Sequence, residues 1–515
     1  MIGSVNILSD KSVQAKQDPP STQRSLGERI ALGTAWIMGA RMIVRMLGLI
    51  NTLILARLLV PEDFGLVAIG ITLMQLLQNI SDIGVRQTVI RFRTADGNMM
   101  DTIFTLSAIR GLGVMLIMLA LVPVAPALFD DERTAAVVLA ISFTPFILGL
   151  KNPRFYELER ELDFTRTFQL DAAVKIVSVA ISVAIALTFR TYWAIVFGIL
   201  AGALTETVLS YFFRPYRPRL SFHSLREVFG FSGWVAAVSF ITALNNKLDV
   251  LIMPKLTGPA ATGAFYLGHQ IADIPTEEIA APVARAVYPG LSELQKKQEE
   301  MNRTFLQGVE VLAAIGLPAA FGCALVANDL VVVLLGERWD AVIPIFQIYA
   351  PAAGFVMLFM ALEGYAMARD RTHLIVWREV AYFCFRTPLL IWAASTYGLI
   401  GAIWATALGA AFKASASLLV YQGVSIRSFW LPLWQIRRTL FACSMMAFWL
   451  LLTRPLIPFW SDLLPLIRLM ADATIGGLVY ITTHYLAWRV SGQPDGVESR
   501  ARKYVLVALG REKSS

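Results

Sequence analysis

Long apolar segments follow one another along almost the whole chain, and they restrict its possible folds more than any other feature. Each has about 20 residues or more, the length that an α-helix needs to cross a bilayer. We identify fourteen of them, at approximately 31–58, 64–84, 102–128, 133–152, 168–189, 193–213, 232–256, 260–282, 306–329, 342–366, 373–395, 399–421, 437–457 and 466–488. Strands of a membrane barrel would be about 10 residues long and strictly alternating. The sequence therefore predicts an all-α polytopic membrane protein.

The positive charges predict how these helices are oriented. Loops on the side assigned to both chain ends contain most of the 45 Lys and Arg residues. Loops on the opposite side contain only Arg57, Arg133, Arg190, Lys255, Arg338, Arg454 and Arg468. Because Lys and Arg are enriched in cytoplasmic loops, we expect both termini to be cytoplasmic. The formal charge of +8 then follows from the topology, and we expect no nucleic-acid partner.

A turn motif that occurs twice indicates an internal duplication. In each copy a cation, a Pro and a Gly follow one another at intervals of four residues, where one apolar segment ends and the next begins. The motif comprises Arg57, Pro61 and Gly65 in the first copy and Lys255, Pro259 and Gly263 in the second. Pro cannot continue a helix, and Gly relieves steric crowding in a tight turn. We interpret the motif as the outer hinge of two cavity-lining helices.

Further matches extend the duplication over twelve segments. Tyr156–Arg160 parallels Tyr365–Arg369, and Thr191-Tyr192 parallels Thr396-Tyr397. An even number of segments in each copy makes the two halves parallel, related by an axis along the membrane normal. The predicted parts are a disordered cytoplasmic tail (1–30), a six-helix lobe (31–213), a cytoplasmic linker (214–227), a second six-helix lobe (228–421), an extra helix pair (422–488) and a basic cytoplasmic tail (489–515).

Several charged residues lie inside the predicted membrane segments. A charge at the bilayer centre costs about 3 kcal/mol on insertion scales, so most of these side chains should face a watery interior or one another. The bases are Arg41, Arg45, Arg110, Lys175, Lys247, Arg386 and Lys413, and the acids are Glu206, Asp249, Glu310 and Glu379. We take all seven bases as candidates for a cationic, substrate-binding cavity.

The first and seventh segments carry the strongest candidates. Arg41 and Arg45 are one helical turn apart and share a face of the first segment. Lys247 lies at a similar depth in the seventh, its counterpart in the second half. Arg donates bidentate hydrogen bonds to phosphate, and Lys supplies a point charge. Matching helices that present such cations predict a central site for an anionic, phosphate-bearing substrate.

Other roles are open for some of these residues. Arg110 and Lys175 lie within a few turns of predicted cytoplasmic ends, where long side chains can snorkel to the surface. Lys413 and Glu206 occupy nearly equivalent positions in the two halves and could form a structural pair between them. Asp249 could neutralise Lys247 or Arg45, or take part in ion coupling.

Motifs of common enzymes are absent from the sequence. It contains no phosphate-binding loop for ATP, no paired His at zinc spacing and no Gly-x-Ser-x-Gly nucleophile elbow. Its three Cys residues all fall within apolar segments and lack metal-ligand spacing. We therefore expect no enzymatic activity, no cofactor and no metal.

Two pairs of segments carry a resemblance to a known family. They are Leu55–Ile69 with Ser81–Gly84 and Gln87 in the first half, and Leu248–Tyr266 with Ile274–Ser292 in the second. In these segments the chain resembles the bacterial polysaccharide transport family, the Wzx-type flippases of the multidrug/oligosaccharidyl-lipid/polysaccharide flippase superfamily. The resemblance covers the first twelve segments.

This resemblance implies two lobes in a V around a cationic cavity lined by segments 1 and 7. It implies a multi-pass protein of the bacterial inner membrane that moves polyprenyl-diphosphate-linked oligosaccharides by alternating access, for exopolysaccharide, capsule or lipopolysaccharide synthesis. Its partners would be the lipid-linked glycan, membrane lipids and, as candidates, a polysaccharide polymerase and co-polymerase. The alternatives are a cation-coupled multidrug antiporter of the same superfamily, whose cavity should be dominated by acids, and a non-transporting scaffold of a glycan assembly complex.

Overall fold

The computed structural model of the chain consists of helices and connecting loops, and no strand occurs among the residues that it describes. Those residues are 26–82, 89, 97–161, 163–223, 233–280, 282–284, 291, 294, 297–425, 427–457, 460, 462–493, 496 and 498–499. The predicted tail 1–30 therefore lies outside them except for the first residues of α1, and most of the predicted tail 489–515 lies outside them as well. The prediction of an all-α fold is confirmed.

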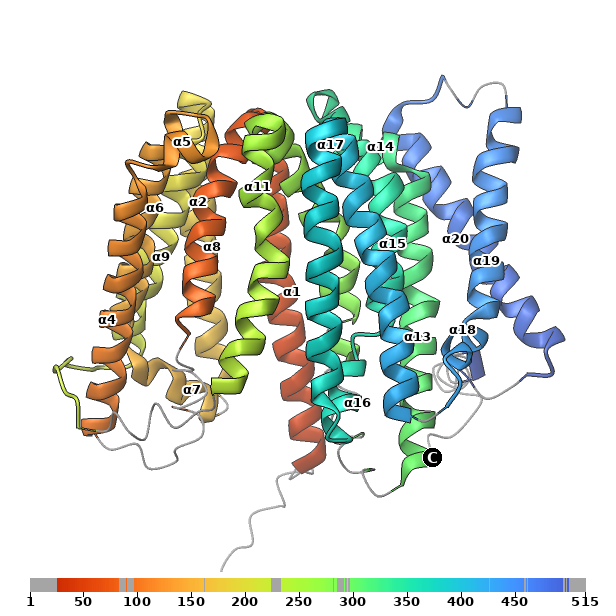
Figure 1. The fold of residues 1–515 in the computed structure, drawn as a ribbon, viewed down its shortest axis with the longest axis horizontal. Coiled ribbons are helices and arrows are strands. Elements are labelled where there is room, and N and C mark those ends of the chain that lie inside the picture. The colour runs from red at the N-terminus through yellow and green to blue at the C-terminus, as the bar shows by residue number, and fades with distance from the viewer. Residues whose placement is uncertain are drawn as a thin grey trace, which may run out of the picture.

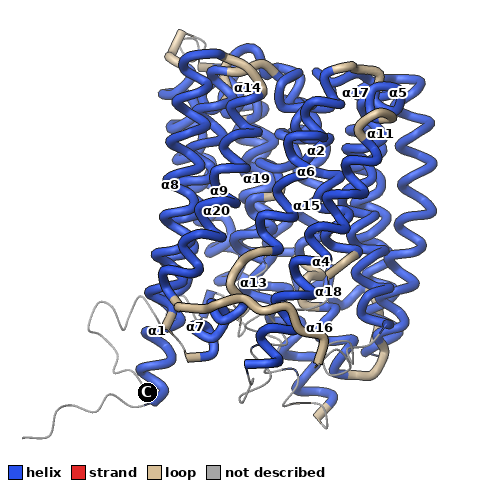
Figure 2. Tube along the Cα trace, turned by 90° about the vertical axis from the view of Figure 1, so that its left-hand side faces the viewer, coloured by secondary structure: helices blue, strands red, loops and turns tan. Residues whose placement is uncertain are grey.

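The helices run between two ends at which the loops gather (Figure 2). In the first half they are α1 (Leu26–Leu58), α2 (Pro61–Ile80), α4 (Gly97–Leu121), α5 (Ala125–Phe129), α6 (Arg133–Gly149), η1 (Pro153–Tyr156), α7 (Glu157–Arg160), α8 (Phe164–Phe189) and α9 (Trp193–Phe213). In the second they are α11 (Gly233–Ala272), η2 (Thr276–Ala280), α13 (Gln298–Leu325), α14 (Ala327–Leu334), η3 (Glu337–Val342), η4 (Ile345–Tyr349), α15 (Ala350–Met357), α16 (Leu362–Ala368) and α17 (Thr372–Ser425). They are followed by α18 (Trp430–Gln435), α19 (Arg437–Phe448), η5 (Trp449–Thr453), η6 (Arg454–Leu456) and α20 (Pro465–Val490).

Eight of the described helices are long and apolar enough to cross a membrane, and counting α6 with the bent pair η1–α7 gives nine. All fourteen predicted segments nevertheless coincide with helical structure. The number of long apolar helices is smaller because some segments are divided into shorter helices and two long helices each contain two segments. The two long helices, α11 and α17, contain non-helical glycines at Gly258 (φ 82°, ψ 168°) and Gly398 (φ 62°, ψ −142°). These positive φ values are readily adopted by Gly but not by other residues.

Helix α17 folds back on itself at Gly398. A straight helix of its 54 residues would be about 80 Å long, far more than a bilayer core of about 30 Å. Arg378 donates a hydrogen bond to Ser417 across the two arms, and Phe385 stacks on Phe412 with a centroid separation of 4.5 Å. The arms are therefore antiparallel neighbours and correspond to two membrane segments.

The helices form two neighbouring groups and an appended pair (Figure 1). Helices α2, α4, α6, α8 and α9 pack on one another, as do α11, α13, α15 and α17. Helices α19 and α20 pack together and against α13. We call the end with α5 the upper end, and the end with α7, α16 and α18 the lower end, as in Figure 1.

The two groups meet most extensively at the upper end, where α2 packs on α11. Trp339 is fully buried there, and its Nε1 donates a hydrogen bond of 2.8 Å to the carbonyl of Ala56 in α1. Phe64 contacts the Trp339 ring edge-on, with centroids 5.2 Å apart. This apolar and hydrogen-bonded contact closes the space between the groups at its upper end.

Candidate functional site

A cavity of about 1470 Å³ lies between the two groups of helices. Residues of α1, α2 and α8 line one side, and residues of α11, η2 and α17 line the other. The lining extends to Lys151, Glu159 and Phe164 near the lower end, but it includes none of the turn-motif residues. The cavity therefore extends toward the lower end and is closed above by the contact between α2 and α11. Its volume exceeds the roughly 300–1,000 Å³ of a small-molecule pocket, so it can hold several sugar rings.

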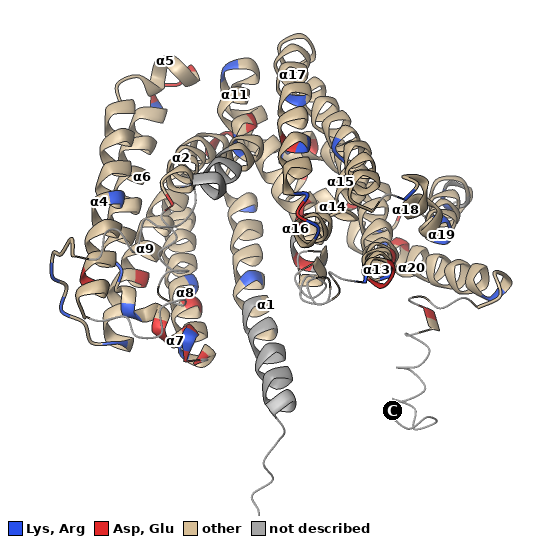
Figure 3. Ribbon diagram, turned by 60° about the horizontal axis from the view of Figure 1, so that its bottom comes forward, with Lys and Arg blue, Asp and Glu red and all other residues tan. Residues whose placement is uncertain are grey.

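Six of the predicted site residues line this cavity. They are Arg45, Lys175, Lys247, Asp249, Arg386 and Lys413. Arg41 belongs to α1, but its side chain lies outside the described residues. In Figure 3 charged residues mark α1, α8 and α17, helices that are otherwise largely uncharged. A role of the six in binding substrate stays a prediction.

Two predicted residues lie elsewhere. Arg110 does not line the cavity, and its guanidinium pairs with Asp82 at 3.1 Å on the first group of helices. Glu206 pairs at 2.7 Å with Lys151 instead of Lys413, so the structural pair suggested between the halves is wrong. Glu206 and Arg110 each pair with a residue of the first half of the chain.

Asp249 and Arg386 form a buried ion pair between α11 and α17, and each side chain is about 10% exposed. Arg386 also donates a hydrogen bond of 2.8 Å to the carbonyl of Asn245. Asp249 therefore neutralises Arg386, and Arg45 pairs with Glu278 instead of Asp249. A role of Asp249 in ion coupling stays a prediction.

Glu379 is the centre of a second network in the same wall. Lys413 donates to its carboxylate at 3.1 Å, Arg378 at 2.6 Å, and the side-chain amide of Asn245 at 3.1 Å. Arg378 was not among the charged residues singled out in the sequence, although it lies next to Glu379 inside the predicted segment 373–395. Lys151 was missed in the same way, two residues after α6 ends at Gly149.

Lys175 differs from the other cations of the cavity. Within the part of the chain that the structure describes, it has no hydrogen-bond or ion-pair partner. Its side chain crosses to α1, where a Cβ on Gly48 would lie 2.9 Å from Cε and 3.0 Å from Nζ of Lys175. Gly48 therefore makes room for an ammonium group that has no carboxylate beside it. An anion that enters the cavity could bind here without breaking an existing pair.

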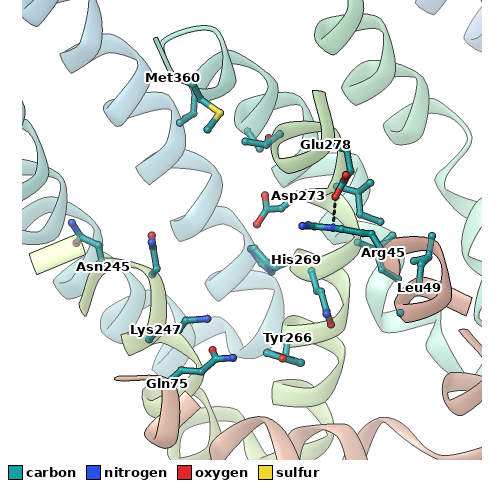
Figure 4. Close-up of a pocket in the computed structure, with 18 of the residues that line it drawn as sticks. Arg45, Leu49, Gln75, Asn245, Lys247, Tyr266, His269, Asp273, Glu278 and Met360 are labelled. Atoms are coloured by element: carbon teal, nitrogen blue, oxygen red, sulfur yellow. Dashed lines mark ion pairs between the residues drawn. The ribbon is translucent and has the colours of Figure 1, made fainter. Parts of the chain in front are cut away.

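Arg45 reaches across the cavity. Its guanidinium forms an ion pair with Glu278 of η2, on the other side (Figure 4). Lys247, His269 and Asp273 lie around the same space.

The second group of helices adds an aromatic and polar wall. His269 lies between Phe265 and Tyr349, with ring centroids 4.1 and 4.2 Å away. The Tyr349 hydroxyl donates a hydrogen bond of 2.9 Å to Asp273. Such a combination of flat rings with hydrogen-bonding groups suits a polar ligand that also has apolar faces, as sugars have.

The charge of the cavity is more balanced than the sequence predicts. Its Lys and Arg residues are Arg45, Lys151, Lys175, Lys247, Arg378, Arg386 and Lys413, and its Asp and Glu residues are Glu159, Asp171, Asp249, Asp273, Glu278 and Glu363. The described lining thus has only one more base than acids. Among the described residues, no group of three or more His, Cys, Asp or Glu side chains is arranged to hold a metal ion.

The turn-motif residues lie at the upper contact between the two groups. A Cβ on Gly65 would overlap the carbonyl of Pro259, and a Cβ on Gly263 would overlap that of Pro61. Arg57 donates a hydrogen bond to the carbonyl of Val333, whereas Lys255 is exposed. The two copies of the motif therefore pack against each other, and their role as a hinge stays a prediction.

The sequence of the chain is similar to a known protein family and to individual proteins of polysaccharide synthesis. The model of a family described as "Polysaccharide biosynthesis protein" matches residues 54–344. Lipopolysaccharide biosynthesis protein WzxC of Escherichia coli is 25% identical over 329 residues, covering 63% of this chain and 67% of the relative. Succinoglycan biosynthesis transport protein ExoT of Rhizobium meliloti is 22% identical over 434 residues, covering 83% and 87%.

Solved structures share the fold. Lipid II flippase MurJ in an inward closed conformation superimposes with a TM-score of 0.68 at 15% identity, covering 88% of this chain and 99% of that one. A multidrug resistance transporter of the MATE family, in the MOP superfamily, gives a TM-score of 0.54 at 15% identity, covering 74% and 95%.

Proposed function

The chain belongs to the polysaccharide biosynthesis protein family, and from this premise we propose that it is a flippase for lipid-linked oligosaccharides. The names of WzxC and ExoT connect those relatives to lipopolysaccharide and succinoglycan synthesis. The observation that carries the proposal is the cavity of about 1470 Å³ between two groups of membrane helices, with cations from both. The family resemblance found in the sequence agrees with this assignment.

The substrate is a polyprenyl-diphosphate-linked oligosaccharide. Its diphosphate binds to Lys175, Lys247 and Arg45, and its sugars lie against the aromatic and polar wall around His269 and Tyr349. Lys and Arg suit this task because they combine charge with several hydrogen-bond donors. The polyprenyl tail stays in the surrounding lipid, so that the protein needs to enclose only the polar head group.

Translocation follows from alternating access between the two lobes, which we assign to 31–213 and 228–421. The lower end faces the cytoplasm, in accordance with the distribution of Lys and Arg, and both termini lie there in the bacterial inner membrane. The head group enters from this end. Separation of α2 from α11 at the upper end then exposes it to the periplasm, where a polysaccharide polymerase with its co-polymerase is the proposed recipient.

A drug antiporter of the same superfamily is the runner-up, because the cavity has nearly as many acids as bases. Ion pairs that two of these acids already form argue against this alternative. Asp249 and Glu278 are each bound to an Arg and are not available to an organic cation without loss of that pair. A drug-resistance assay in an efflux-deficient strain separates the two functions, since only the antiporter raises resistance.

Deletion of the gene in its bacterial host tests the proposal. We expect polyprenyl-diphosphate oligosaccharide to accumulate on the cytoplasmic face of the inner membrane and export of the glycan to cease. The wild-type gene should restore export, whereas Lys247→Ala and Arg45→Ala should not, although both variants reach the membrane. A deletion strain with normal glycan export and no accumulated lipid would overturn the proposal. If the glycan assembly complex also persisted in this strain, the alternative role as a non-transporting scaffold would be contradicted as well.

A further inference from the structure

Glu278 places a carboxylate on the guanidinium of Arg45, a residue that we expect to bind the substrate. The two side chains come from opposite walls of the cavity, Arg45 from α1 and Glu278 from η2 (Figure 4). Both residues line the cavity. The carboxylate therefore occupies the position on Arg45 that a phosphate oxygen of a ligand would take.

The surroundings of this pair differ from those of the structural pairs in the same cavity. Arg45 is 47% exposed and Glu278 20%, whereas Arg386 and Asp249 are each about 10% exposed. The guanidinium side of the pair is thus accessible from the cavity, whereas the Glu278 Oε1 atom that contacts it is buried. An incoming anion can therefore reach Arg45 without first displacing the pair between Asp249 and Arg386.

The elements that hold the two residues are anchored independently of the pair. Helix α1 packs on α8, in the first group of helices, and η2 packs on α13 and α15, in the second. The two groups are joined by the extensive upper contact between α2 and α11. Neither element depends on the Arg45–Glu278 pair for its position, and this argues against a mainly structural role.

We propose that Glu278 is a built-in competitor of the anionic head group for Arg45. The inference rests on the proposed function, and it assigns to Glu278 a role in setting affinity. A diphosphate carries more charge than one carboxylate, so it displaces Glu278 from Arg45. When the head group leaves, Glu278 binds Arg45 again, which prevents the anion from being held too tightly for release. Binding sites in other proteins likewise combine favourable contacts with groups that oppose binding.

The sign of a substitution distinguishes this role from a positioning role. If Glu278 competes, Glu278→Gln strengthens diphosphate binding, by about two- to fivefold when judged from the strength of exposed ion pairs. If Glu278 instead orients Arg45 for the ligand, the same variant weakens binding. The gain must also depend on Arg45, so adding Glu278→Gln to an Arg45→Gln variant should bring no further change.

The experiment measures binding to the purified full chain in lipid nanodiscs. One arm uses undecaprenyl diphosphate and a second uses inorganic pyrophosphate, which distinguishes a lipid-borne diphosphate from a free one. The matched control is Glu299→Gln, because Glu299 forms an exposed ion pair with Arg427 outside the cavity. We expect tighter binding by Glu278→Gln, weaker binding by Arg45→Gln and no change for the control.

Each outcome has a separate meaning. Equal or weaker binding by Glu278→Gln, with a wild-type protein that binds the diphosphate lipid, overturns the competitor role but not the proposed function. A gain that persists in the Arg45→Gln background also overturns it. Failure of the wild-type protein to bind the diphosphate lipid contradicts the proposed function itself. Binding of pyrophosphate but not of undecaprenyl diphosphate would contradict the proposed function in the same way and assign the site to a soluble anion.

Discussion

Gly65 of α2 lies so close to Pro259 of α11 that a Cβ on this glycine would overlap the proline carbonyl oxygen. The reciprocal relationship holds between Gly263 and Pro61. The repeated motif therefore forms a contact with its own second copy, between α2 and α11. This contact closes the cavity at its upper end, where the proposed alternating access would require the two groups of helices to separate.

Alanine at Gly65 should loosen the upper contact. The added methyl group meets backbone atoms, which cannot move as a side chain would, so Gly65→Ala and Gly263→Ala should each destabilise the closed state by about 1–3 kcal/mol. The measurement is the thermal midpoint of the purified protein, together with the accessibility of a cysteine introduced near the contact. Gly113→Ala is the control, since a Cβ there meets no atom within 4 Å. Unchanged stability and accessibility in both variants would show that the contact is looser than described.

The Arg386–Asp249 pair should be important for stability. Because both side chains are buried, Arg386→Ala or Asp249→Ala leaves an unpaired charge, and each should cost about 3–5 kcal/mol. Thermal unfolding of the purified variants measures the loss. The double variant Arg386→Leu with Asp249→Leu removes both charges and should be more stable than either single variant. Single variants as stable as the wild-type protein would contradict the buried pair.

Lys175 should show the opposite behaviour, with a loss of transport and no loss of stability. No described residue neutralises its ammonium group, so Lys175→Ala removes no pair from the fold. We expect the variant to unfold at the same temperature or higher and to have a raised KM for the lipid-linked glycan. Gly48→Ala, which crowds the Lys175 side chain, should impair transport in the same direction. A destabilised Lys175→Ala variant with normal transport would assign Lys175 to the fold.

Asp131, in the upper loop before α6, gives a prediction about pH. A hydrogen bond from the Arg133 guanidinium holds the pKa of Asp131 below its usual value, which is about 4 in unfolded chains. A carboxyl group with a lowered pKa in the folded state contributes stability above its unfolded pKa, and this stability is lost as the pH falls through the lower folded value. The difference in thermal midpoint between the wild-type protein and Asp131→Asn should thus be constant from pH 7 to about pH 5 and shrink below about pH 4. A difference that grows on acidification would contradict this pairing.

The helical membrane fold could be predicted because the length of an apolar segment is a local property of the sequence. The charges inside apolar segments identified Arg45, Lys175 and Lys247 in the same way, since a charge in a membrane helix requires a polar surrounding. The pairing between helices could not be predicted, because it depends on which faces meet. The two turn motifs touch each other, whereas Glu206 and Lys413 bind other partners, namely Lys151 and Glu379.

The central claim, that the chain moves a lipid-linked glycan through the cavity between its lobes, is tested most directly in liposomes. Purified protein is reconstituted with a polyprenyl-diphosphate oligosaccharide that carries a fluorescent sugar, and a membrane-impermeant quencher reports the fraction of sugar on the outer face after loading of the inner one. We predict transfer well above that of protein-free liposomes, and transfer close to background for Lys175→Ala and for Arg45→Ala. Transfer by the wild-type protein no faster than in protein-free liposomes, or equally fast in both cavity variants, would contradict the account.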